Sequence, residues 1–363
     1  MTTRVFLIFY LLLLVATTTQ ARSIVDGAGR TVTIPDTVNQ VICSGAGCVR
    51  LLSYLQSQNT LVGVDDLETR KRQRDPRPYA IANPQFKALP VFGEFRGHDH
   101  PEQILTLENQ PQVIFKTFSQ MGHDPIELQQ KTGIPVVVLQ YGNLTQLRPE
   151  FYTSLRTMAT VLGKEQRAEQ VITFIEQTIT DIQHRTTNID MRPSVYLGGV
   201  AFKGPHGFQS TEPTYPPFAF LDAQNCAAVK IAGEHELSNS NVAKEKIVSW
   251  NPNYLFLDLS TIRLGEDAGG LYELRHDPAY RTLSAVQSGK VFGLLPYNMY
   301  AANHGSTLAN SYYIGKTLYP DRFTDINPTE KADEIYEFLV GKPVFNAMNT
   351  MCGNMAFSSV PVQ

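Results

Sequence analysis

The 363-residue sequence has little cysteine, and four residues are too few for a disulfide framework in a chain of this length. Cys43 and Cys48 are five positions apart in a glycine-rich turn and could close a small ring. Cys226 and Cys352 could form a second pair. A disulfide needs Cα atoms within about 7 Å of each other, so for each pair both the bridge and two free thiols stay open. Neither pair has the C-x-x-C spacing of zinc ligands.

An excess of charge is also lacking. The net charge of −3 and the charged fraction of 18% give no basic field of the kind that nucleic-acid-binding proteins use, which excludes nucleic acid as a partner. The sequence has no G-x-S-x-G, H-E-x-x-H or C-x-x-C motif, and its histidines are scattered. We therefore expect no enzymatic activity and no bound cofactor, with a metal-dependent two-lobed enzyme as the less favoured alternative.

A single long apolar run is present, and it lies at the N-terminus. Arg4 gives a cationic start, residues 5–15 are almost entirely apolar, and Ala21 offers a cleavage point. The run is shorter than the roughly 20 residues that span a bilayer. Residues 1–21 are therefore interpreted as a cleavable signal peptide that exports the protein to the periplasm. An uncleaved anchor is less favoured, because a Ser/Thr-rich stretch and Arg22 end the apolar run early.

Two parts of the chain share one pattern, which indicates an internal duplication. Residues 102–115 read as an amphipathic helix that turns at a proline into a buried strand, and residues 245–256 repeat this order. In the next unit, Asp124 precedes a proline at the start of a helix, and a strand then leads to Tyr141. Asp277 and Tyr297 hold the corresponding positions in the second copy. Two consecutive matches in the same order favour a repeat over chance.

The repeat predicts an α/β fold of two similar lobes, each a mainly parallel sheet flanked by helices, joined by a long connecting helix. Residues 22–163 are assigned to the N-terminal lobe and residues 164–190 to the connecting helix, after a break at Gly163. Residues 191–345 are assigned to the C-terminal lobe and residues 346–363 to a loosely ordered tail. Parallel strands bind ligands beyond their carboxyl ends, so a cleft between the lobes is expected.

These features, in this order, resemble the periplasmic binding proteins of ABC importers for iron siderophores, haem and vitamin B12. The resemblance covers essentially the whole mature chain and is carried by residues 41–45, 61–65, 102–104 before Pro111, and 198–204. It implies a monomer that captures an iron complex of the siderophore type, or a related metal chelate, in the inter-lobe cleft and delivers it to a permease at the inner membrane. Haem or cobalamin, a corrinoid, is the alternative ligand for the same role.

The resemblance also implies a docking role for Glu102 and Glu245, which match the glutamates that this family presents to arginines of the permease. They are equivalent positions of the duplication, and two equivalent charges suit a two-fold permease surface. The alternative is a glutamate at a helix start that is favoured by the helix dipole and has no partner.

Several polar residues follow predicted strands and are candidates for contact with the ligand. Ser44 and Gly45 offer backbone N–H groups at a helix start, although small residues there could simply allow tight packing. Arg96 could pair with a carboxylate, phosphate or catecholate oxygen. His98 could ligate a metal, but a solvated histidine is the more common case. The metal ligands themselves stay unknown.

The second copy of the repeat adds further candidates. Lys203 lies in a glycine-punctuated loop, and Tyr300 and His304 follow the last repeated strand. Phenolate and imidazole can ligate Fe(III) or haem iron, and tyrosine rings also stack on flat macrocycles. Packing of these loops on their own lobe is the alternative. Because Tyr141 and Tyr297 are repeat equivalents at facing strand ends, we expect both to line the cleft. The long connecting helix should limit closure of the lobes.

Overall fold

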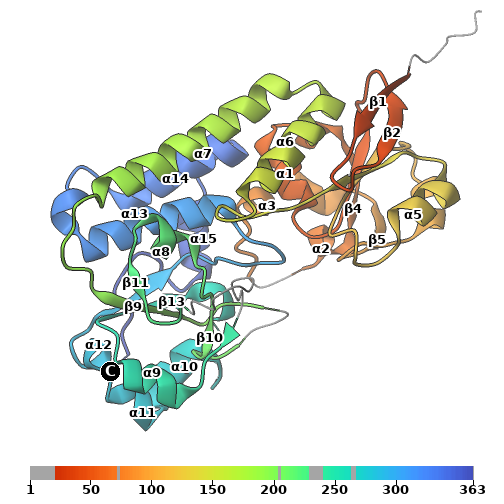
Figure 1. The fold of residues 1–363 in the computed structure, drawn as a ribbon. Helices are drawn as coiled ribbons and strands as arrows, with labels where there is room; N and C mark the ends of the chain where they lie inside the picture. Colours follow the sequence, from red (N-terminus) through yellow and green to blue (C-terminus); the bar gives the residue numbers. More distant parts are fainter. Residues whose placement is uncertain (1–20, 72–73, 203–205, 229–239, 263–266, 363) are drawn as a thin grey trace, which may run out of the picture.

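The computed structural model describes residues 21–71, 74–202, 206–228, 240–262 and 267–362. Figure 1 shows two α/β lobes with a long helix running between them, as the repeat predicts. The proposed signal peptide lies outside the described residues, apart from Ala21, which begins the first strand. In the described part of the chain, we find no helix with the length and apolar character needed to cross a membrane.

The first lobe contains a six-stranded sheet in the order β6-β5-β4-β3-β7-β8, parallel except for the short edge strand β6. An antiparallel hairpin, β1 (Ala21–Val25) and β2 (Thr31–Pro35), precedes it. The sheet strands are β3 (Val41–Ser44), β4 (Leu61–Asp65), β5 (Val91–Glu94), β6 (His98–Asp99), β7 (Val113–Thr117) and β8 (Val136–Leu139). The helices are α1 (Cys48–Tyr54), α2 (Asp66–Thr69), α3 (Pro78–Ala82), α4 (Pro101–Leu105), α5 (Pro125–Thr132) and α6 (Arg148–Leu162), with 3-10 turns η1 (Gln58–Thr60) and η2 (Pro84–Ala88).

The second lobe contains a four-stranded parallel sheet in the order β11-β9-β13-β14. Its strands are β9 (Ser194–Gly198), β11 (Gln224–Asn225), β13 (Tyr254–Asp258) and β14 (Val291–Leu294), and β10 (Ser210–Thr211) pairs with β12 (Ser240–Asn241). The helices are α8 (Pro216–Phe220), α9 (Lys244–Trp250), α10 (Gly269–His276), α11 (Pro278–Arg281), α12 (Ser284–Gln287), α13 (His304–Leu318), α14 (Pro328–Val340) and α15 (Phe345–Met351), with 3-10 turns η3 (Leu259–Thr261) and η4 (Pro320–Arg322).

The connecting helix α7 (Glu165–Arg185) runs across the top of the view in Figure 1 from one lobe toward the other. It is separated from α6 by Gly163, whose φ of 64° lies in the left-handed region that ends helices. Along α7 the apolar residues recur every three or four positions and are buried, because this spacing places them on one face. The predicted helix pair with a break at this glycine is confirmed.

The two repeated Asp-Pro units cap helices as the sequence predicts. The Asp124 carboxylate accepts hydrogen bonds from the backbone N–H groups of Ile126 and Glu127 at 2.9 and 3.0 Å, and the Asp277 carboxylate accepts one from Ala279 at 2.9 Å. The second unit differs from the first in one respect: its helix is divided into α11 and α12. The second of these helices, α12, is not capped by the aspartate: the backbone N–H of Ser284 at its start donates to the side-chain oxygen of Asn251 at 2.9 Å.

Replacing Asp124 with alanine is expected to lower the free energy of unfolding by about 1 kcal/mol, because two N–H groups at the start of α5 lose their acceptor. Urea unfolding of the variant measures this change. Asp190→Ala, at an exposed bend, serves as the control and should change the free energy by less than about 0.5 kcal/mol. Equal losses in the two variants would show that the cap contributes nothing of its own.

The C-terminal segment is ordered, so the expectation of a loosely ordered tail is wrong. It forms α15 and then runs beside β14, where Phe292 and Gly293 make β-bridges to Ser359 and Ala356. Val360 donates its N–H to the Val291 carbonyl at 2.8 Å and is buried. The segment therefore covers the exposed edge of the second sheet, which would otherwise present unpaired backbone groups.

All four cysteines are free thiols. Cys43 lies in β3 and Cys48 begins α1, so both are buried in the core of the first lobe, and burial raises the pKa of the Cys48 thiol well above its ordinary value. Neither of the two disulfides left open by the sequence is formed.

Candidate functional site

A cleft of about 770 Å³ lies between the lobes. Its first-lobe wall comes from the loops that follow β3, β5, β7 and β8, and its second-lobe wall from the loops that follow β9, β10, β13 and β14. Parallel strands bring these loops to the same edge of each sheet, which is why residues distant in sequence meet here. The described lining residues are Ala46, Phe95, Arg96, Phe118, Met121, Tyr141, Gly142, Asn143, Ala201, Phe202, Glu212, Thr214, Ser260, Thr261, Ile262, Tyr297, Asn298, Met299, Tyr300, Ala301 and Ala302.

Aromatic rings make up much of the cleft wall. The rings of Phe118 and Tyr141 stack with centroids 5.7 Å apart and an interplanar angle of 27°. The ring of Phe95, from the first lobe, meets the ring of Tyr300, from the second lobe, edge to face at 5.5 Å. Such rings offer large apolar faces to a ligand at low cost in side-chain entropy. The cleft is therefore suited to a ligand with flat or apolar parts.

Two charged side chains, Arg96 and Glu212, are present among the described lining residues. The Arg96 guanidinium lies 5.0 Å from the centre of the Phe95 ring, on the first-lobe wall. The Glu212 carboxylate, on the second-lobe wall, is buried and accepts hydrogen bonds from the hydroxyl and backbone N–H of Thr214 at 2.8 and 3.2 Å. The walls thus carry opposite charges, with the positive one on the first lobe.

Three lining residues have backbone angles in the left-handed region although they are not glycine. The φ values are 65° for Arg96, 51° for Phe118 and 62° for Tyr300. A side chain in this region costs about 1–2 kcal/mol, and such positions concentrate at functional sites. These three positions are therefore candidates for residues whose placement in the cleft outweighs a local cost in backbone strain.

Phe118→Gly and Phe118→Ala both remove the ring, but only glycine relieves the backbone strain at φ 51°. The glycine variant is therefore expected to be more stable than the alanine variant by about 1 kcal/mol, measured by thermal or urea unfolding. Both variants should bind the ligand more weakly, because the stack on Tyr141 is lost. An alanine variant that is as stable as the glycine variant would show that this position is not strained.

The hydroxyl of Tyr141 is engaged within the protein. It donates to the carbonyl of Ala302 at 2.8 Å and accepts a hydrogen bond from Arg50. Burial raises the pKa of Tyr141, so its phenolate form is disfavoured. Tyr141 therefore offers the cleft its ring rather than a metal-binding oxygen, and burial likewise raises the pKa of Tyr297.

The cleft brings together four of the residues predicted from sequence: Arg96, Tyr141, Tyr297 and Tyr300. Their contact with a ligand stays a prediction. Lys203 lies outside the described residues. The other four predicted residues, Ser44, Gly45, His98 and His304, are not among the lining residues.

The reasons for these four placements are local. The Ser44 hydroxyl is buried and accepts a hydrogen bond from Lys116 at 3.1 Å, and Ala46, two residues further on, takes the place on the wall that was expected for Ser44 and Gly45. His98 lies in the edge strand β6 and is exposed. The sequence pattern places every residue of a loop after a strand at the cleft, whereas in the structure only part of each loop faces it.

His304 lies behind the cleft wall, at the start of α13. Its ring stacks on Phe151 at 4.2 Å and on Tyr141 at 5.0 Å. Burial, together with the positive charge of Arg50, lowers the pKa of His304 to about 3, so the ring is neutral in the folded protein at neutral pH. It packs against the face of the Tyr141 ring from behind the wall. In the described ranges of the chain, no cluster of three or more His, Cys, Asp or Glu side chains is arranged to hold a metal ion.

Sequence reasoning missed two buried cations that support the cleft. The Lys116 ammonium, from β7, forms an ion pair with Asp99 at 2.6 Å and donates to the carbonyl of Gly97 at 3.1 Å. It thereby fixes the loop that presents Arg96. The second cation, Arg50 in α1, donates to the loop that follows β14. Each is a charged residue in a largely apolar stretch, VIFKTF and CVRLL, and this is the signal by which they could have been found.

Two α/β lobes, a long helix between them and one cleft at the carboxyl ends of both sheets define a two-lobed solute-binding protein. The family model described as periplasmic binding protein matches residues 41–297, and the chain belongs to this family.

Named relatives agree with this assignment. The molybdate-binding protein MolA of Haemophilus influenzae is 23% identical over 342 residues, which cover 87% of this chain and 90% of MolA. The structure of MolA bound to molybdate superposes with a TM-score of 0.67 at 20% identity, covering 89% of this chain and 98% of that one. A periplasmic solute-binding protein from Veillonella parvula gives a TM-score of 0.69 at 16% identity, covering 92% and 97%.

A third solved structure, CeuE of Helicobacter pylori in a complex with nickel and histidine, gives a TM-score of 0.59 at 17% identity, covering 91% of this chain and 99% of that one. The family and these relatives are binding proteins. The chain is therefore a periplasmic solute-binding protein of an ABC transporter and not an enzyme, which confirms the family, the two-lobed fold and the transport role predicted from sequence.

Proposed function

We propose that the cleft captures an anionic metal chelate with aromatic or other flat apolar parts, of the ferric siderophore type, and presents it to the permease. The observation that carries the proposal is the wall itself: aromatic rings from both lobes with Arg96 beside them, around about 770 Å³. Pockets of about 300–1,000 Å³ bury ligands of the size of a drug molecule. Residues 1–21 would direct export as a signal peptide.

Molybdate is the second candidate, because the likeness to MolA extends over 87% of this chain. A small oxyanion, however, needs a shell of hydrogen-bond donors when it leaves water. Nearly half of the described lining residues here are alanine, phenylalanine, methionine or isoleucine, whose side chains offer an oxyanion no hydrogen-bond donor. The wall therefore favours a larger chelate whose apolar parts cover these residues. Haem and corrinoids share that character.

Calorimetric titration of the purified mature protein with four probes tests the proposal: ferric tris-catecholate, haemin, cyanocobalamin and sodium molybdate. We expect ferric tris-catecholate to bind with a Kd of about 1 μM or lower, and Arg96→Gln to weaken it about tenfold by removing the charge. Arg156→Gln, at an exposed ion pair on α6, is the matched control and should bind as the wild type does. Stoichiometric binding of molybdate alone would establish the second candidate instead.

Glu102 and Glu245 are both exposed and lie outside the cleft, in the first turns of α4 and α9. We propose that they dock onto the permease. Reversing both charges, in Glu102→Arg with Glu245→Arg, should abolish uptake in cells that carry the permease and leave ligand affinity unchanged, because charge complementarity at the docking surface is lost.

Glu165→Arg is the matched control for this experiment, since Glu165 is likewise an exposed glutamate in the first turn of a helix. This variant should support uptake at the wild-type rate. A loss of ligand affinity in the double variant would place the two glutamates at the cleft rather than at the permease. Uptake that survives both reversals would refute the docking role.

A further inference from the structure

The guanidinium of Arg50 is a buried charge. Arg50 lies in α1, is 2% exposed, and has no carboxylate within 4.0 Å among the described residues. A buried cation without an anionic partner is costly unless several dipoles accept its hydrogen bonds. The acceptors around Arg50 therefore show what the charge is used for.

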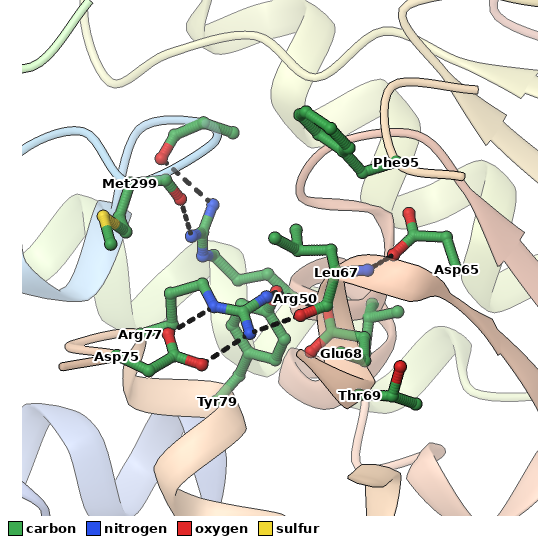
Figure 2. Close-up of polar contacts among 12 residues, drawn as sticks. Arg50, Asp65, Leu67, Glu68, Thr69, Asp75, Arg77, Tyr79, Phe95 and Met299 are labelled. Carbon is green, nitrogen blue, oxygen red and sulfur yellow. Dashed lines mark hydrogen bonds and ion pairs between the residues drawn. The ribbon is translucent and has the colours of Figure 1, made fainter. Parts of the chain in front are cut away.

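These acceptors come from both lobes. In the first lobe, one terminal nitrogen of Arg50 donates to the Tyr141 hydroxyl. In the second lobe, that nitrogen donates to the Ala302 carbonyl at 3.0 Å, and the other donates to Asn303 Oδ1 at 2.6 Å and to the Met299 carbonyl at 3.4 Å. Figure 2 shows Arg50 reaching to Met299 in this way.

The loop that Arg50 holds is also part of the cleft. Met299, Tyr300, Ala301 and Ala302 all line it, as does Tyr141 on the facing wall. A further hydrogen bond joins the two walls directly, since the Tyr141 hydroxyl donates to the Ala302 carbonyl at 2.8 Å. Asn303 is in turn tied to the end of β14 by its amide, which donates to the Pro296 carbonyl at 2.9 Å. Arg50 thus links a wall residue of one lobe to a wall loop of the other.

An apolar arrangement that replaced Arg50 together with its acceptors would avoid the cost of burying a charge, and such replacements of complete buried polar groups are often neutral for stability. Stability alone therefore does not account for an arginine at this position. What a leucine or methionine could not do is hold carbonyl groups from the second lobe against Tyr141, because that requires several donors in one rigid plane.

We propose that Arg50 is a positioning residue that sets the width of the cleft before the ligand arrives, by holding Tyr141 and the loop of residues 299–303 in one hydrogen-bonded unit. The inference rests on the two-lobed fold and not on the identity of the ligand. It predicts that the ligand-free protein has a narrow distribution of inter-lobe distances, and that the distribution depends on this side chain.

Spin labels on Gln130→Cys in α5 and Gln287→Cys in α12, one exposed site on each lobe, measure this distribution in the full mature chain without ligand. Cys226→Ser removes the one native cysteine that is not buried. In Arg50→Met we expect the distribution to shift or broaden by about 2 Å or more, the scale of hinge rearrangements. Arg50→Lys keeps the charge but has fewer donors, so its distance distribution should lie between those of the wild type and Arg50→Met.

Tyr141→Phe gives a second, milder test, because it removes the bridging hydroxyl and keeps the ring in the wall. It should broaden the distribution in the same direction. Arg156→Met is the control for loss of an arginine and should leave the distances unchanged. A folded Arg50→Met protein with the wild-type distribution overturns the proposal. If that variant does not fold, a wild-type distribution in Tyr141→Phe overturns it.

Discussion

Replacing Lys116 with methionine is expected to lower the free energy of unfolding by about 3–5 kcal/mol. The Lys116 ammonium is fully buried and lies 2.6 Å from the Asp99 carboxylate, whose side chain is also buried. Removing the cation leaves a buried anion with no counter-charge, which is far more costly than the loss of a hydrogen bond. The Gly97 carbonyl and the Ser44 hydroxyl lose a donor in the same step. Urea unfolding at pH 7 measures the loss.

Two further variants separate loss of the pair from loss of one partner. Lys116→Met combined with Asp99→Leu replaces both charges with apolar groups and should recover much of the stability, because no unpaired charge remains. Arg156→Met breaks an exposed ion pair in which both side chains are about half accessible, and it should cost no more than about 1 kcal/mol. A Lys116→Met protein as stable as the Arg156→Met protein contradicts the argument.

The elements of this fold could be predicted from the sequence because local chemistry fixes them. Asp124 and Asp277 each precede a proline and cap a helix, and these interactions involve neighbouring residues alone. The positive φ of Gly163 likewise separates α6 from α7 where the apolar periodicity is interrupted. Tyr141 and Tyr297 could also be predicted to line the cleft, because they follow equivalent strands of the repeat and such strands end at the same edge of each sheet.

The rest of the site could not be predicted from the sequence, because it depends on contacts between residues that are distant along the chain. Phe95 and Phe118 carry no local signal that would distinguish a wall residue from a core residue, and their rings are placed by loops with left-handed backbone angles at Arg96 and Phe118. For His304 the local signal was misleading. A histidine near a strand end was expected in the cleft, yet three aromatic neighbours bury it behind the wall.

Asp65 ends β4 within a crowded group of buried acids, part of which Figure 2 shows. The Arg77 guanidinium forms ion pairs with Glu68 at 2.9 Å and with Asp75 at 2.6 Å. One cation thus serves two carboxylates, and Asp65 is a third acid nearby. Burial, followed by the negative charge of Glu68, raises the pKa of Asp65 to about 8. Asp65 is therefore protonated in the folded protein at neutral pH and ionised in the unfolded chain.

The sign of the resulting pH dependence follows from this difference. Below about pH 4 the carboxyl is protonated in both states, and the contribution of Asp65 to stability is fully present. Between about pH 4 and pH 8 the folded state keeps a proton that the unfolded state has lost, so the free energy of unfolding falls as the pH rises. The loss is on the order of a few kcal/mol by pH 8, because one pKa unit corresponds to about 1.4 kcal/mol.

Asp65→Asn is expected to remove this dependence, because asparagine resembles the protonated acid and still offers an oxygen to the Leu67 N–H, which now donates to Asp65 at 3.1 Å. The variant should match the wild type near pH 4 and exceed its free energy of unfolding increasingly toward pH 8. Urea unfolding across this range measures the difference, with Asp36→Asn at an exposed position as the control. A difference between Asp65→Asn and the wild type that does not change with pH contradicts the raised pKa, since the variant would then report only on packing and on the cap of α2.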